Sequence, residues 1–373
     1  MYKITLTIPI YNSGKYLRDL LESIIKQTFD FRNIQVIMVD DFSLDNSRDI
    51  MDEYSNKYDN FISIKLTSNH KIAGTARNAG IERAEGKYLM FSDADDFLPE
   101  NACELLYNEI ESKNADFVNG NYINTDEDGK LWNVPIFNKK KYTNFKMSIT
   151  DYEKSFFILN GSACNKIFRS SFVKENNIRF LEGVPAEDAY FTTSCFMKSK
   201  NVYYINDIIY CYRQRNKDSV TKSVSFDCSK EYFDNINIAY RLIYENFKKN
   251  GYIGFYRYTY AKNMSYMLYK FIDSKLLSHE ERTQILKEMR WFYELSGILK
   301  VPPCQEEQVM IVDKIVKEDY EEAVNYCKII ANIRVKLPKE IKESLSRPDA
   351  DMYRKISLYD DEYKRISKER LLI

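Results

Sequence analysis

The stretch Tyr88-Leu89-Met90-Phe91-Ser92-Asp93-Ala94-Asp95-Asp96 leads from an apolar segment into three carboxylates. Its four leading apolar residues predict a short buried strand, so the carboxylates follow the carboxyl end of that strand. Ligands of open parallel sheets bind at this end, and two carboxylates one residue apart can hold a divalent cation with a diphosphate. Taken alone, Asp93 and Asp95 more often belong to a solvated turn. Their meaning therefore depends on the other segments of the chain.

Strand and helix patterns alternate through the first part of the chain. Over 17–25, apolar residues recur at the i, i+3, i+4, i+7 and i+8 positions of a helix with one buried face. The alternation predicts a mostly parallel, Rossmann-like α/β sheet with right-handed crossovers and helices on both faces. The expected strands are 4–10, 36–39, 61–66, 88–91 and 115–118, and further helices are expected around Ile50, from about 75 to 84 and around Leu105.

Composition limits the class of protein. The chain has 373 residues, enough for two or three domains, and its 55 basic and 55 acidic side chains cancel, which argues against a nucleic-acid partner. Seven scattered cysteines without a Cys-x-x-Cys pair argue against a disulfide framework or a zinc site and favour a reducing cytosol. Neither a signal peptide nor a run of about 18 apolar residues occurs. We therefore expect a soluble cytoplasmic chain and leave open a peripheral association with the inner face of the plasma membrane.

Polar residues also gather behind the second predicted strand and in a later loop. Asp40 and Asp41 close that strand, where a carboxylate can accept the ring N–H of a pyrimidine base or a ribose hydroxyl. Gly74 can let backbone approach a ligand, and Arg77, at a helix amino terminus, can hold a base edge or a phosphate. A surface ion pair is the alternative for Arg77. His70 has no second histidine or cysteine nearby, so we expect it on the loop surface.

Together these segments resemble the inverting glycosyltransferases of family 2, which have the GT-A fold. The matching segments are Pro9–Asn12, Val39–Asp45, Asn69–Gly80 and Phe91–Asp96. The resemblance implies that Asp41 and the backbone of Pro9–Tyr11 hold uracil. The donor-binding residues that it implies are Pro9, Tyr11, Asp40, Asp41, Asn69, Arg77, Asp93 and Ala94. Phe42 stands where the family usually has glycine, a departure that would crowd the base pocket.

The pair Glu187-Asp188, which opens a predicted helix, also resembles the family. In the family the second acid is the catalytic base, so Asp188 would take the proton of the acceptor hydroxyl as it attacks the anomeric carbon. Glu187 would orient the acceptor or keep the geometry of the pair. Asn165 and Lys166, which precede the pair, are expected to bind the acceptor. The alternative is that both acids are helix-start residues favoured by the helix dipole.

A divalent ion is implied at Asp95, with Asp93 as a second ligand. There it would bridge the diphosphate and act as a Lewis acid. Without a histidine nearby, the site suits Mn²⁺ or Mg²⁺ better than Zn²⁺. The stretch 210–221 resembles the family's loop that closes over the nucleotide, and Arg213, Arg215 and Ser219 would meet the phosphates there. A solvated basic loop is the alternative.

The character of the chain changes near residue 225. We expect a GT-A catalytic domain over 1–225, a helical acceptor-side region over 226–300 and a helical extension over 301–373. Aromatic residues at helical spacing crowd the second region, and most of them should pack between helices. Pro302-Pro303 interrupts the helical pattern before another helix pair. The charged end indicates oligomerisation or a chain cut from a longer one.

The sequence therefore predicts a bacterial, metal-dependent glycosyltransferase. It would move a hexose or N-acetylhexosamine from a UDP-sugar, with inversion, to a hydroxyl of a cell-surface glycopolymer such as teichoic acid or capsule, or of a lipid-linked saccharide. A nucleotidyltransferase shares the sheet and the metal chemistry, but it would not need Glu187-Asp188 and would need a glycine-rich basic loop after the first strand. The non-enzymatic alternative is a nucleotide-sugar or glycan binding module.

Overall fold

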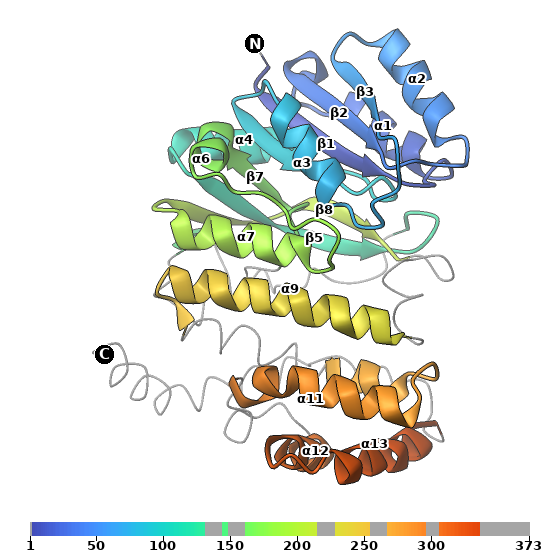
Figure 1. Cartoon of the computed structure of the whole chain (residues 1–373). Coiled ribbons are helices and arrows are strands. Elements are labelled where there is room, and N and C mark those ends of the chain that lie inside the picture. Colours follow the sequence, from blue (N-terminus) through green and yellow to red (C-terminus); the bar gives the residue numbers. More distant parts are fainter. Residues whose placement is uncertain are drawn as a thin grey trace. The chain divides into compact units, whose positions relative to one another are not determined.

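The computed structural model describes residues 2–130, 144–147, 161–214, 228–253, 267–295 and 306–335. The chain divides into two compact units, Met1–Asn216 and Lys217–Ile373. Figure 1 shows their elements coloured along the sequence. The three-part division expected from the sequence stays a prediction.

The first unit is an α/β sheet with helices, as predicted. Its described strands lie in the order β3-β2-β1-β4-β7-β5-β8-β6. β7 is antiparallel to both β4 and β5, and β6 is antiparallel to β8, whereas the other pairs are parallel. The elements are β1 (Ile4–Ile10), α1 (Leu17–Ile25), η1 (Phe31–Asn33), β2 (Ile34–Asp40), α2 (Ser47–Lys57), β3 (Phe61–Lys65), α3 (Gly74–Arg83), β4 (Tyr88–Phe91), α4 (Ala102–Ser112), β5 (Phe117–Thr125), β6 (Phe145–Met147), β7 (Lys166–Arg169), α6 (Ser170–Glu175), α7 (Glu187–Lys198) and β8 (Val202–Arg213).

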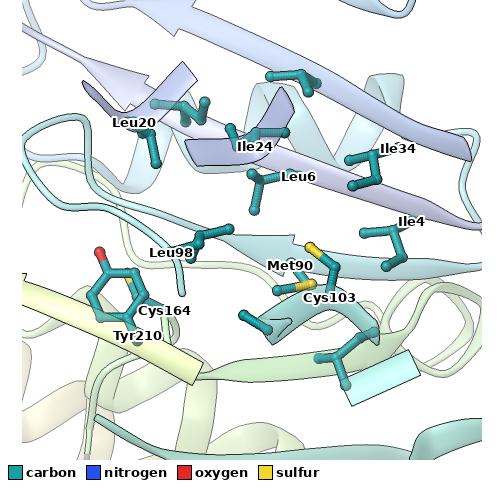
Figure 2. Packing of buried hydrophobic residues seen from close by; sticks show 14 of the residues in the cluster. Ile4, Leu6, Leu20, Ile24, Ile34, Met90, Leu98, Cys103, Cys164 and Tyr210 are labelled. Carbon is teal, nitrogen blue, oxygen red and sulfur yellow. The ribbon is translucent and has the colours of Figure 1, made fainter. Parts of the chain in front are cut away.

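Alternation along the strands divides the core between the two faces of the sheet. Leu6 of β1 and Met90 of β4 belong to a buried cluster to which α1, α2 and α4 also contribute (Figure 2). Ile37 and Val39 of β2 belong to a separate cluster with Ala76 of α3. Each fully buried aliphatic side chain contributes about 1.5–3 kcal/mol to folding. The apolar periodicity of the strands and of α1 therefore accounts for these layers.

Aromatic rings extend the core between β4, β7 and α7. Phe91 of β4 lies edge-on to Phe168 of β7 and to Phe191 of α7, with ring centroids 6.0 and 5.5 Å apart. Phe180 stacks on Phe191 with ring centroids 4.0 Å apart. Such contacts add to the stability gained from burial of the rings. They fix the start of α7 relative to the end of β4.

The segment around Leu181 docks on α3 through backbone contacts. Asn78 Nδ2 donates to the Phe180 carbonyl at 3.0 Å, and Asn78 Oδ1 accepts from the Phe180 N–H at 2.9 Å. A Cβ on Gly74 would lie 1.9 Å from the Leu181 carbonyl oxygen. The sequence predicts that Gly74 gives room to a ligand, but the close approach is made by the chain's own backbone. This docking carries Glu187 towards the carboxyl end of β4.

The second unit is helical in its described parts, as predicted. Its elements are α9 (Lys230–Lys249), α11 (His279–Leu295), α12 (Glu306–Val316) and α13 (Tyr320–Val335). Ser229 caps α9 by accepting from the Tyr232 N–H at 3.3 Å, and Tyr240 of α9 stacks on Phe292 of α11. Pro302-Pro303 lies outside the described residues. No helix in the described parts of the chain has the length and apolar character needed to span a membrane.

Replacing Gly74 with alanine tests the docking of the Leu181 segment. In an unobstructed helix alanine is the better residue, but here its methyl group meets a backbone oxygen. We expect Gly74→Ala to lower the free energy of unfolding by about 1–3 kcal/mol, measured by urea denaturation. Gly183→Ala is the comparison, because a Cβ there meets nothing within 4 Å, although its φ of +72° adds backbone strain. A Gly74→Ala protein as stable as wild type would contradict the close packing.

Candidate active site

Arg77 joins three carboxylates at the carboxyl edge of the sheet. Its Nη2 donates to Asp93 Oδ1 at 2.7 Å, and its Nη1 donates to Glu187 Oε1 at 2.9 Å and to Asp188 Oδ1 at 2.6 Å. The Arg77 side chain is only 3% exposed. The expected contact of Arg77 with a nucleotide does not match this burial, because its guanidinium faces the acids of its own chain. Arg77 instead brings the acidic loop after β4 to the start of α7.

Burial and the charges of this cluster shift the pKa of Asp188. Burial raises the pKa of Asp188 to about 7; Arg77 acts in the opposite direction, and Glu187 and Asp93 raise the pKa further. The Arg77 pKa is raised well above its ordinary value by the three acids, which outweigh its burial. A carboxylate with a pKa near neutrality is suited to accept a proton at physiological pH. The cluster therefore holds one carboxylate, Asp188, whose pKa of about 7 is higher than that of an ordinary aspartate.

A cavity of about 360 Å³ opens beside this cluster. Its walls come from β5, β8, the segment before β7, the acidic loop and α7. The lining residues are Asp93, Tyr122, Ser162, Asn165, Asp188, Tyr210 and Tyr212. Sequence reasoning missed the three tyrosines. The available signal was the i, i+2 spacing of Tyr210 and Tyr212, which places both on one face of a strand.

Asp96 holds the acidic loop to β8. It is fully buried and accepts from Tyr210 Oη at 2.5 Å and from the Arg213 N–H at 2.7 Å. Burial and the neighbouring Asp95 and Asp93 raise its pKa well above the ordinary value. The Tyr210 hydroxyl also accepts from the Asp93 N–H at 3.1 Å. These contacts leave Asp93 and Asp95, both partly exposed, as the carboxylates that a ligand can reach.

The Asp40-Asp41 pair divides into two environments. Asp40 has no exposed surface; it accepts from the Ser43 N–H and from Arg48 Nε, the latter at 2.6 Å. This carboxylate therefore closes its own turn, and a contact of Asp40 with a nucleotide stays a prediction. Asp41 accepts from the His70 N–H at 3.0 Å and lies 2.7 Å from His70 Nδ1. His70 lies on a loop with a side chain that is 34% exposed, as expected, but its contact with Asp41 was not predicted from the sequence.

Asn165 and Lys166 differ in their access to the cavity. Asn165 lines it and donates from Nδ2 to the Gly120 carbonyl at 2.6 Å. Lys166 is fully buried, and its Nζ donates to the Ser162 carbonyl at 2.6 Å and to Asn165 Oδ1 at 2.8 Å. Burial lowers the Lys166 pKa to about 7. Lys166 therefore supports the cavity wall from behind, and its expected contact with an acceptor stays a prediction.

The other predicted donor-binding residues lie in several environments. Arg213 is the last residue of β8 rather than part of a loop; it is buried and donates to Asp19 Oδ2 at 2.9 Å and to the Glu127 carbonyl at 2.8 Å. Its expected phosphate contact is thus not supported by its placement. Arg215 and Ser219 lie outside the described residues. Pro9 and Asn69 are partly exposed, Ala94 is buried, and Tyr11 is 48% exposed.

Known proteins resemble this chain in sequence and in fold. The model of glycosyl transferase family 2 matches residues 5–176. Glycosyltransferase GlyG of Streptococcus pneumoniae is 33% identical over 57% of this chain and 71% of its own length. Poly(ribitol-phosphate) beta-N-acetylglucosaminyltransferase TarP of Staphylococcus aureus is 31% identical over 66% and 73%.

Other similar proteins are longer or more distant. Poly(ribitol-phosphate) beta-glucosyltransferase of Bacillus spizizenii is 28% identical over 83% of this chain, which spans less than half (46%) of that protein. Residues 1–349 of S. aureus TarS, solved in complex with UDP, superpose with a TM-score of 0.68 at 20% identity, covering 90% of this chain and 93% of that one. This likeness shows the GT-A fold. With two relatives above 30% identity matched over more than two thirds of their length, the chain belongs to glycosyltransferase family 2.

Proposed function

We propose that this glycosyltransferase moves a hexose or N-acetylhexosamine from a UDP-sugar to a hydroxyl of a cell-surface glycopolymer, with inversion. The observation that carries the proposal is the position of Asp188 on the cavity wall, joined through Arg77 to the acidic loop after β4. An acceptor hydroxyl in the cavity would lie between a general base and the donor side of the site. This arrangement suits displacement from the face opposite the leaving group.

Asp188 would act as the base. The acceptor oxygen forms a bond to the anomeric carbon, the bond from that carbon to the diphosphate oxygen breaks, and the hydroxyl proton passes to the Asp188 carboxylate. A pKa near 7 leaves a substantial fraction of Asp188 ionised at neutral pH and makes it a stronger base than an ordinary aspartate. Glu187 would keep Asp188 in place through their shared contact with Arg77 Nη1.

Asp93 and Asp95 fit a hard divalent cation such as Mn²⁺ or Mg²⁺. Both carry carboxylate oxygens, which hard cations prefer as ligands, and both are partly exposed in the loop after β4. In the described parts of the chain, no three acidic, histidine or cysteine side chains gather as a metal site. Diphosphate and water oxygens would therefore complete the coordination. The cation, when bound, neutralises charge on the leaving diphosphate.

The relatives support the donor and acceptor classes. TarP and the B. spizizenii protein are named for transfer of N-acetylglucosamine and glucose to poly(ribitol-phosphate), and TarS has been solved with UDP-GlcNAc. By analogy, a polyol-phosphate polymer is the acceptor class to test first, with UDP-GlcNAc and UDP-glucose as donors. Hydroxyl groups of such a polymer provide the nucleophile that the cavity requires.

Asp188→Asn should abolish transfer without loss of donor binding. The amide cannot accept the proton, so we expect transfer to fall by at least about 100-fold, while the dissociation constant for UDP changes less than about two-fold. UDP release in the presence of acceptor measures the first quantity, and calorimetry measures the second. Asp59→Asn, which alters an exposed aspartate outside the site, is the matched control. Equal transfer by wild type and Asp188→Asn would remove the base assignment, and no UDP release with any donor would favour a binding module.

Asp95→Asn should remove the metal dependence of nucleotide binding. Wild type is expected to bind UDP more tightly with Mn²⁺ than with a chelator, because a cation held by Asp95 would neutralise charge on the diphosphate. Since the variant lacks this carboxylate, its affinity for UDP should be nearly the same with and without Mn²⁺. Calorimetric titrations under both conditions provide the measurement. A variant that keeps the full Mn²⁺ effect would place the cation elsewhere.

Glu187→Gln should shift the pH profile of transfer to lower pH. Activity requires ionised Asp188, so it rises as pH passes through the Asp188 pKa of about 7. The negative charge of Glu187 raises the Asp188 pKa by repulsion. The neutral side chain of Glu187→Gln should therefore lower the Asp188 pKa, so that the acidic limb of the profile, where kcat rises, lies at a lower pH. Arg77→Gln should move the limb in the opposite direction, because it removes the positive charge that lowers the same pKa. Unshifted limbs in both variants would show that Asp188 does not govern the profile.

A further inference from the structure

Phe42 has a backbone conformation that bulky residues rarely adopt. It follows Asp41 directly after β2 and has a φ of +70°, in the left-handed region that favours glycine. Its side chain is nevertheless 41% exposed, so burial does not explain why a large aromatic residue occupies this position. Strained residues that the surrounding structure holds in place often serve a function.

The surroundings hold the Phe42 ring in one place. The Arg48 guanidinium lies over the ring, 5.3 Å from its centroid, and Arg48 Nε donates to the fully buried Asp40 at 2.6 Å. Asp40 also accepts from the Ser43 N–H, which closes the turn that contains Phe42. One side of the ring is thus supported by a fixed cation, while the rest of the ring remains accessible.

The turn lies beside the carboxylate expected to recognise the base. Asp41 precedes Phe42 and is held by His70. The turn after β1 is tied to this one, because the Asn12 N–H donates to Ser43 Oγ at 2.9 Å. Tyr11, 48% exposed, is on that neighbouring turn. A pyrimidine that donates its ring N–H to Asp41 would therefore meet exposed aromatic surface close by.

We propose that Phe42 is a platform on which the nucleobase of the donor stacks, and so a determinant of donor affinity. This inference rests on the proposed function and deepens it. Stacking of a base on an aromatic ring depends on the π-face, whereas the hydrogen bond to Asp41 depends on the base edge, so the two contacts complement each other. The glycine usual in the family offers no such surface. Crowding of the pocket by Phe42, the expectation from the sequence, predicts the opposite effect on affinity.

Calorimetric titration with UDP and with UMP, in the presence of Mn²⁺, tests the platform. We expect Phe42→Gly to weaken both ligands by a similar factor of at least about five, because only the base contact is lost. Phe42→Tyr should bind within about two-fold of wild type, since it keeps an aromatic face. Leu44→Ala, which changes an 80% exposed aliphatic residue in the same region, is the control and should leave affinity unchanged. Glycine is favoured at positive φ, so the turn should survive the substitution.

The outcomes separate this inference from the proposed function. If Phe42→Gly binds UDP and UMP as tightly as wild type or more tightly, the platform is overturned. Tighter binding would show that Phe42 crowds the base pocket. Weakened binding of UDP without weakened binding of UMP would also overturn it, because the affected contact would then be the terminal phosphate. If wild type binds no nucleoside diphosphate, the proposed function fails, and the platform fails with it.

Discussion

The buried guanidinium of Arg77 connects parts of the chain that would otherwise repel one another. Asp93, Glu187 and Asp188 all contact it, and they come from the loop after β4 and from the start of α7. Without the cation, these acids would share a poorly solvated space as uncompensated like charges, which is a costly arrangement. The planar guanidinium offers several donors in a fixed fork, so one arginine can hold three acids where lysine would offer a single point charge.

Local pattern was sufficient to predict much of the fold. β1 and β4 have the bounds expected from their apolar runs, and α1 has the length expected from its periodicity. β7 was not predicted, because its antiparallel pairing with both β4 and β5 depends on contacts between distant residues. The burial of Lys166, which begins β7 and donates to the Ser162 carbonyl, was for the same reason not predicted. Strand pairing of this kind has no signature in a short window of sequence.

The site was predictable to the extent that its chemistry follows from short motifs. The acidic loop after β4 was proposed as a site from residue types and spacing, and the pair at the start of α7 from its resemblance to the family. Which acids pair with Arg77, and which are buried, could not be read in this way. Asp40 and Asp41 are neighbours in sequence with the same side chain, yet one closes a turn and the other is held by His70. Burial and partner choice are properties of the assembled sheet.

The docking of the Leu181 segment on α3 has a consequence for which of its residues can change. Asn78 binds the main-chain N–H and carbonyl of Phe180, and Gly74 accommodates the main-chain oxygen of Leu181. Main-chain atoms are the same in every residue type except for the missing N–H of proline, so a change of the Leu181 side chain can leave these contacts in place, whereas Phe180 is also held by the stacking of its ring on Phe191. The attachment of this segment to α3 thus restricts the residue at Phe180 more than the residue at Leu181.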